Sequence, residues 1–304
     1  MSDLKINNIT DSTGNSGPTI AGICTVASTG AFVVPVGPTE YRGGRGRGII
    51  AGGYTPSGHT NTMNYIEIAT TGNAVDFGDL LSPTASSGST GSSSNSIRGV
   101  FNSGDVPNSI NTISYTVISS GGGTSDFGDM SYVTRDGPFG GGDNTRGVLG
   151  GSAGGPSNMG GSPGKGVNYI DFITFATTGD SNDFGTLTVA RRGVCACSSP
   201  TRTVWGGGYI KPSNHTQVVD YVTTQTKGDA THFGELTVSR GFGGATSTQT
   251  RGIFGGMRFQ PAINNVIDYI SMQNGGAAID FGDLTIPTKE VGMTSDSHGG
   301  LGGF

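Results

Sequence analysis

Two stretches of the chain place tyrosine, histidine and amide side chains together in short polar segments. They are YTPSGHTN at 54–61 and YIKPSNHTQ at 209–217, and the pair Arg258-Phe259 follows another glycine-rich strand. Aromatic rings stack on the apolar CH face of a sugar, while amide and imidazole groups hydrogen-bond its hydroxyls. The predicted ligand contacts are Tyr54, His59, Asn61, Tyr209, Asn214, His215, Arg258 and Phe259.

Two other interpretations of these segments stay open. The two histidines could belong to a metal site, but such a site needs further ligands from elsewhere in the chain, and the sequence offers none. The segments could also be ordinary polar turns. No metal and no cofactor is therefore predicted.

Charged residues also recur at fixed places. Arginines open one strand of each repeat, and aspartates precede a repeated phenylalanine, with His232 as the exception. They could form a ring of anion or metal sites, but a residue that every repeat contains is one that the repeat itself needs, so we favour a structural role. The residues are Arg47, Arg98, Arg146, Arg202, Arg251, Asp76, Asp126, Asp183 and Asp280.

Motifs of catalysis are missing from the sequence. It has no SxDxGxxW turn of the sialidase type, no nucleophile elbow, no zinc spacing and no phosphate loop. The chain is therefore predicted not to be an enzyme.

Composition excludes several partners. The net charge is −5, and no basic run exceeds Arg191-Arg192, so a nucleic-acid partner is not expected. The sequence contains no run of 18 apolar residues, so no membrane insertion is predicted. Its first residues lack the apolar core of a signal peptide. Cys24, Cys195 and Cys197 are interpreted as small buried apolar residues.

The 57 glycines follow a repeat. The phrase DFG, or HFG once, occurs five times, and its phenylalanine always lies 12 residues after an aromatic residue of the preceding strand. Each copy also has an apolar strand that ends in glycines, such as RTVWGGGY, and a less regular strand before it, such as RRGVCACSSPT. We name the four strands a, b, c and d in chain order. They recur every 48 to 56 residues, which is typical of β-propeller blades.

This pattern resembles the kelch repeat. The glycine pair that closes strand b, the aromatic residue in strand c and the second aromatic residue in strand d carry the resemblance, although phenylalanine stands where kelch repeats have tryptophan. The resemblance implies an all-β, kelch-like propeller with four antiparallel strands per blade.

The chain ends suggest how the ring closes. Residues 285–304 match strands a and b, with His298 in the arginine position, and the hairpin at 19–42 matches strands c and d, with Phe32 in the place of Phe184. The prediction is six blades in 19–304, the sixth built from both termini. The alternative is five blades plus a separate N-terminal hairpin. Residues 1–18, rich in Asn, Ser, Thr and Gly, are predicted to be an extended attachment segment.

Loop lengths distinguish the two faces of the predicted propeller. The c-to-d hairpins are nearly the same in each copy, whereas b-to-c ranges from DVPNSIN to SAGGPSNMGGSPGKGVN. We call the side with the a-to-b and c-to-d loops the constant face, and the side with the b-to-c and d-to-a loops the variable face. Binding sites usually lie on variable loops of a fixed scaffold, so the ligand is expected on the variable face.

The phrases YRGGRGRGIIAGGY, IATTGNAVDFGDL and KINNITDSTG resemble repeat proteins of tailed phages of marine cyanobacteria, which are described as virion structural or fibre-like proteins. The resemblance implies a virion protein made in the host cytoplasm, present in several copies or as a homo-oligomer, with other virion proteins as partners. Two functions stay open: a tail- or capsid-displayed adhesin for host-surface glycan, or a purely structural decoration or adaptor protein.

Overall fold

The structure is a computed structural model that describes residues 19–20, 24–25, 47–52, 54–55, 58–67, 72–81, 91–102, 110–134, 138–154, 165–212, 214–256, 263–288 and 293. The chain divides into two compact units, 1–43 and 44–304. In the first unit, β1 (Thr19–Ile20) pairs antiparallel with β2 (Cys24–Thr25). All regular elements of the described ranges are strands, and these ranges contain no helix able to cross a membrane.

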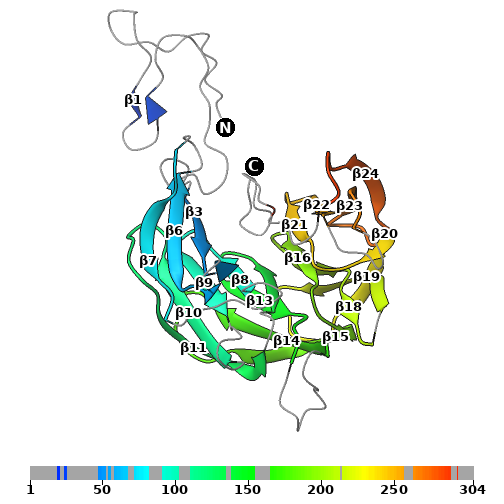
Figure 1. Ribbon diagram of the computed structural model, residues 1–304, viewed down its shortest axis with the longest axis horizontal. Coiled ribbons are helices and arrows are strands. Elements are labelled where there is room, and N and C mark those ends of the chain that lie inside the picture. The colour runs from blue at the N-terminus through cyan, green and yellow to red at the C-terminus, as the bar shows by residue number, and fades with distance from the viewer. Residues whose placement is uncertain are drawn as a thin grey trace, which may run out of the picture. The chain divides into compact units, whose positions relative to one another are not determined.

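The second unit is a β-propeller with five consecutive antiparallel sheets, which are blades one to five (Figure 1). Blade one has β3 (Arg47–Ala51), β6 (Thr62–Glu67) and β7 (Val75–Asp79). Blade two has β8 (Gly91–Ser94), β9 (Arg98–Asn102), β10 (Ile110–Val117) and β11 (Ser125–Thr134). Blade three has β12 (Phe139–Gly142), β13 (Arg146–Gly150), β14 (Val167–Thr174) and β15 (Asn182–Arg191). Blade four has β16 (Cys195–Ser198), β17 (Arg202–Gly206), β19 (Asn214–Thr223) and β20 (Thr231–Arg240). Blade five has β21 (Gly244–Ser247), β22 (Arg251–Gly255), β23 (Val266–Ser271) and β24 (Ile279–Asp283).

Two short hairpins extend this plan in the b-to-c loops. β4 (Tyr54–Thr55) pairs with β5 (Gly58–His59) in blade one, and β18 (Tyr209–Ile210) pairs with the start of β19 in blade four. The four strands of blades two to five correspond in order to a, b, c and d, so the predicted all-β propeller with four-stranded blades is confirmed.

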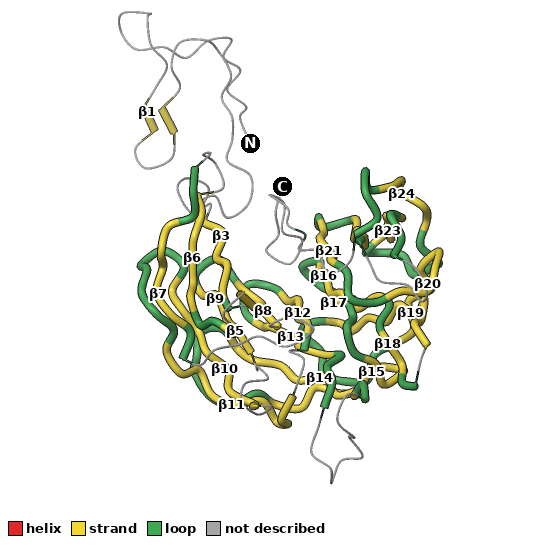
Figure 2. The backbone as a smooth tube through the Cα atoms, viewed as in Figure 1, coloured by secondary structure: helices red, strands yellow, loops and turns green. Residues whose placement is uncertain are grey.

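The inner strands lie next to one another in chain order. β8 contacts β12, β12 contacts β16, and β16 contacts β21 (Figure 2). They line a central cavity of about 510 Å³ with mostly small side chains, among them Ser93, Cys197 and Ser247. Small residues suit strand a because the inner strands lie close together, and β12 and β16 each have an inner strand on both sides.

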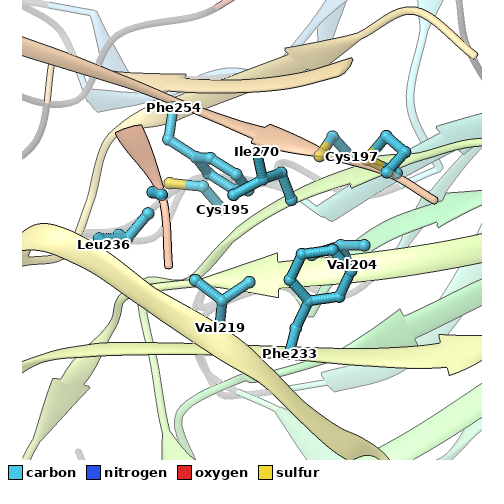
Figure 3. Close-up of a cluster of buried hydrophobic side chains, with 10 residues drawn as sticks. Cys195, Cys197, Val204, Val219, Phe233, Leu236, Phe254 and Ile270 are labelled. Carbon is cyan, nitrogen blue, oxygen red and sulfur yellow. The ribbon is translucent and has the colours of Figure 1, made fainter. Parts of the chain in front are cut away.

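The hydrophobic core is divided into layers between adjacent blades. Figure 3 shows the layer between blades four and five, where Val204, Phe233 and Leu236 of blade four meet Phe254 and Ile270 of blade five. Cys195 and Cys197 of β16 belong to the same layer and are buried, as expected. Blades are therefore held together by the same apolar contacts that form the core.

The described residues contain five blades. Most of the 19–42 hairpin and of 285–304, and all of 1–18, lie outside the described residues, so the predicted sixth blade and attachment segment lie there too. The alternative of five blades fits the described part of the chain.

Candidate binding face and the repeated motif

The phenylalanine of the DFG phrase packs edge to face on the aromatic residue 12 positions earlier. In blade three the ring centroids of Phe172 and Phe184 are 5.9 Å apart at 77°, and Tyr115–Phe127 and the other pairs share this geometry. Strands c and d are antiparallel neighbours, and the phenylalanine lies at a bulge of strand d, from which its ring meets the aromatic residue of strand c diagonally. The constant spacing is thus explained by one cross-strand aromatic pair per blade.

The glycine of the phrase lets the next blade come close. Gly128 has φ +145°, and a Cβ built on it would lie 2.4 Å from the carbonyl oxygen of Gly179 in blade three. On either side of it, the Gly179 N–H donates to the Phe127 carbonyl (2.6 Å) and the Ser181 N–H to the Asp129 carbonyl (2.8 Å). Only glycine combines this φ with so close a backbone approach.

The repeated arginine of strand b also contacts the next blade. The Arg146 guanidinium lies 4.4 Å from the centroid of the Phe172 ring and donates to the Thr224 carbonyl of blade four (3.1 Å). The Arg98 guanidinium lies over Tyr115 and donates to the Phe175 carbonyl. These contacts support the structural interpretation of the arginines. No cluster of three or more His, Cys, Asp or Glu able to hold a metal occurs among the described residues.

Contacts between loops agree with the division into two faces. On the constant face, Gln225 of a c-to-d hairpin donates to the Asp143 carboxylate of an a-to-b turn in the preceding blade. Burial alone would raise the pKa of Asp143, but donors from Gln225, Arg146 and Thr145 lower it below its usual value. On the variable face, a d-to-a turn bridges to a b-to-c loop through backbone bonds between Arg192 and Tyr209.

The predicted tyrosine and histidine contacts come together in pairs. Tyr54 lies opposite His59 in the β4–β5 hairpin, and Tyr209 lies opposite His215 in the β18–β19 hairpin. The rings of Tyr209 and His215 are 5.3 Å apart. Two blades therefore carry the same cross-strand Tyr–His pair on the variable face.

The remaining predicted contacts differ in position. Asn214 is exposed and lies opposite Ile210. Asn61 donates to the Leu80 carbonyl, a contact that Asn111, Gln217 and Asn265 repeat in other blades with partners 19 residues later. Asn61 thus has a structural role in its blade. Arg258 and Phe259 lie outside the described residues.

Two residues that the sequence analysis did not select complete a cluster at blade four. The Arg192 guanidinium lies 5.2 Å from the Tyr209 ring centroid and 5.6 Å from that of Phe242, and Phe242 lies 6.5 Å from His215. We call Arg192, Tyr209, His215 and Phe242 the aromatic cluster. All four residues are partly exposed, although both ring nitrogens of His215 are themselves buried.

Phe242 has an unusual backbone for its residue type. Its φ is +59°, whereas the equivalent position of the preceding d-to-a turn is Gly193 with φ +61°. A non-glycine residue in this left-handed region costs on the order of 1 kcal/mol. Backbone strain of this kind gathers at functional sites, and here it holds a ring on the variable face. Comparing the d-to-a turns copy by copy would have revealed this phenylalanine in a glycine position.

Two buried ion pairs lie at the ends of strands d, next to the variable face. Arg191 pairs with Asp220 of the next blade (3.0 Å), and Arg240 pairs with Asp268, with all four side chains inaccessible to water. Burial lowers the pKa of Arg191, partly offset by Asp220, and burial lowers that of Arg240 to about 10. Both arginines are the last residues of strand d, so these pairs fix the strand ends from which the d-to-a turns project.

Blade two departs from this rule. Thr134 stands in the arginine position. The buried Asp171 accepts bonds from Ser131, as Asp220 and Asp268 do from Thr188 and Thr237, and in place of the arginine it accepts one from Ser181. Burial, with a smaller effect of Asp171, raises the pKa of the neighbouring Tyr132 well above its usual value. The tyrosine therefore stays neutral, and it belongs to the buried apolar layer that also contains Leu149 and Val167.

Comparison with known proteins adds no relative: no protein-family model and no curated protein matches the chain.

Proposed function

We propose that this chain is a non-enzymatic structural protein of a phage virion, displayed on tail or capsid, whose variable face binds host-surface glycan. One observation carries the binding part of the proposal. The departures from the repeat gather on the variable face: two hairpins that place a tyrosine opposite a histidine, and the strained Phe242. The phage assignment rests on the sequence resemblance alone.

The chemistry of the aromatic cluster supports a sugar ligand. Tyr209 and Phe242 offer aromatic rings for the CH groups of a sugar, and the Arg192 guanidinium lies beside both rings as a hydrogen-bond donor. Each such contact contributes on the order of 0.5 to 1.5 kcal/mol, so firm adhesion requires many copies on one particle. A virion supplies such copies.

The constant face supports a scaffold role. The repeated arginines of blades one to four and the c-to-d hairpins of blades two to five make contacts between blades, which supports a role in holding the ring together. The proposal includes docking of residues 1–18 on other virion proteins and no nucleic-acid partner.

The proposal also covers the number of blades in the propeller. We take the ring to have a sixth blade, with strands c and d from the 19–42 hairpin and strands a and b from 285–304. The complementary half-repeats at the two chain ends support this closure.

The test of binding uses Tyr209→Ala with Phe242→Gly. We expect loss of a glycan-array signal and at least a tenfold loss of particle adsorption to host cells. Phe242→Gly relieves the left-handed strain, so the melting temperature should stay within a few degrees of that of the unmodified protein. The matched control is Gln273→Ala, an exposed polar change in a c-to-d hairpin of the constant face, which should alter neither measurement.

A broader variant replaces Tyr54, His59, Tyr209 and Phe259 together by alanine. Normal adsorption of particles that carry this folded variant would contradict the adhesin. The second candidate function, a structural decoration or adaptor protein, would then hold, and a map of the intact particle with both faces covered by neighbouring proteins would support it.

A further inference from the structure

The boundary between blades two and three has a buried carboxylate but no buried arginine. In the next two boundaries, Arg191 pairs with Asp220 and Arg240 pairs with Asp268, and these side chains are inaccessible to water. Asp171 takes the same position of strand c and is 1 % exposed, yet no cationic side chain of the described residues forms an ion pair with it. A buried charge is costly unless an opposite charge accompanies it. This boundary therefore lacks one positive charge that the next two have.

Thr134 does not replace the missing arginine. It ends strand d of blade two and pairs with Ile110, as Arg191 ends strand d of blade three and pairs with Val167. The Thr134 side chain is completely buried, and its hydroxyl has no hydrogen-bond partner within the described ranges. Threonine is uncharged and shorter than arginine, so it leaves the charge of Asp171 uncompensated.

A second substitution brings another hydroxyl to this place. Ser152 of blade three corresponds to Gly208 of blade four, as the equivalent backbone bonds from Val167 to Ser152 (2.9 Å) and from Thr216 to Gly208 (3.0 Å) show. Gly208 lies against the Arg191 side chain, where a Cβ would be 3.1 Å from the arginine Cδ. Ser152 therefore lies where an arginine at the end of blade two would pass. Its hydroxyl is also buried and has no partner in the described part of the chain.

Tyr132 contributes a third buried hydroxyl. Burial raises the pKa of Tyr132 well above its usual value, Asp171 adds to this rise, and Ser152 opposes it. The Tyr132 hydroxyl therefore lies near both residues, and it too has no hydrogen-bond partner among the residues that the structure describes. Asp171 accepts three hydrogen bonds from Ser131 and Ser181, whereas a carboxylate has about four acceptor sites. Three hydroxyls without partners thus gather at the boundary that holds one uncompensated carboxylate.

We propose that this boundary binds a monovalent alkali cation, with Asp171 as its charged ligand and the hydroxyl oxygens of Thr134, Ser152 and Tyr132 as neutral ligands. Hard cations prefer oxygen ligands. One carboxylate balances one positive charge, as Asp220 does opposite Arg191, whereas a divalent ion would leave an uncompensated charge in a buried place. Buried polar groups without partners are explained by a bound ion or water. Water satisfies the hydroxyls alone, but a cation satisfies them and compensates Asp171.

Thermal unfolding of the full chain in sodium, potassium or choline chloride at equal concentration tests the site. Choline is too large for a place that a single side chain fills elsewhere. The protein should therefore melt about 3 to 6 °C lower in choline chloride than in the more stabilising alkali salt, and its melting temperature should rise with alkali cation concentration. Ionic strength is the same in all three salts, so screening of surface charges is unchanged. Equal melting temperatures would overturn the proposal in favour of buried water or a protonated Asp171.

A matched variant rebuilds the neighbouring boundary. It combines Tyr132→Val, Thr134→Arg and Ser152→Gly, which are the residue types that the boundary between blades three and four has at these positions. The new arginine supplies the positive charge next to Asp171, so this variant should melt at the same temperature in all three salts. A response to alkali cations as large as that of the unmodified protein would place the ions elsewhere and refute the site.

Two single variants keep the test decisive if the triple variant does not fold. Asp171→Asn keeps the shape of the side chain and removes its charge, so the difference between choline and the alkali cations should disappear. Thr134→Val removes one ligand at nearly constant shape, so it should raise several-fold the cation concentration that gives half of the stabilisation. An unchanged response in both variants would contradict the assigned ligands. The inference does not depend on glycan binding, so its failure and that of the adhesin are separate results.

Discussion

Two features require glycine in the DFG phrase: a positive φ and the close approach of the next blade's backbone. Replacing Gly128 by alanine, with a suitable control, separates their effects. At Gly128 a Cβ faces both an unfavourable φ of +145° and a backbone oxygen at 2.4 Å. Gly179 has nearly the same φ, +148°, but a Cβ there meets no atom within 4 Å. Gly179→Ala is therefore a control with equal backbone strain and no collision.

The magnitude follows from the contacts at this boundary. The strain common to both variants costs about 1 to 3 kcal/mol. In Gly128→Ala the blade-three hairpin must also move away by about 1 Å to reach an ordinary contact distance of roughly 3.4 Å. This displacement breaks the two backbone hydrogen bonds donated by Gly179 and Ser181, at about 1 kcal/mol each, and exposes more of the buried Phe127 side chain. Gly128→Ala should therefore be less stable than Gly179→Ala by about 2 to 4 kcal/mol.

Urea unfolding followed by circular dichroism measures the difference, provided that both variants keep the same m value. Equal free energies of unfolding for the two variants would refute the idea that close approach of blades requires this glycine.

Three further perturbations test other contacts. Asp268→Asn leaves Arg240 buried without its counter-charge and should lower the free energy of unfolding by about 3 to 5 kcal/mol, while the double variant Arg240→Met, Asp268→Leu should recover most of it in the same urea assay. Burial raises the pKa of Cys195 to about 12 from an ordinary value near 9. The neutral thiol therefore stabilises the fold below pH 9, and this contribution is lost as the pH rises towards 12. In Cys195→Ala the urea midpoint should fall less steeply across that pH range. The pKa of Asp143 is lowered in the folded protein, so its contribution to the free energy of unfolding is present above pH 4 and is lost as the pH falls through the lower folded value. Gln225→Ala should weaken this dependence of stability on acid pH. An unchanged pH profile of the unfolding free energy would contradict the role of Gln225.

The repeat made much of the fold predictable. The constant 12-residue spacing reflects one cross-strand aromatic pair, so the sequence alone indicated a hairpin of fixed length in every blade. The assignment of loops to two faces followed from the alternation of antiparallel strands, and it agrees with the Gln225–Asp143 contact on one face and the Arg192–Tyr209 bridge on the other.

Contacts that cross a blade boundary were harder to predict. Arg191 and Asp220 are 29 positions apart and belong to different copies, so no local pattern joins them. The aromatic cluster was not predicted for a different reason. Phe242 forms it from a left-handed position that sequence rules assign to glycine, and local propensity gives no reason to expect a phenylalanine there.

Agreement and departure among the copies therefore carry different information. A residue kept in every copy, such as the glycine of the phrase, is explained by the boundary it forms with the next blade, and no ligand is needed to account for it. A residue that breaks the repeat at an energetic cost needs another explanation. Phe242 has such a cost in its backbone, and its ring lies at the surface beside Arg192 and His215. At blade two, by contrast, Tyr132 replaces a valine but stays buried in the apolar layer between blades two and three, so that departure is explained by packing. Exposure together with strain distinguishes the two cases, and in the described residues that combination points to the variable face of blade four.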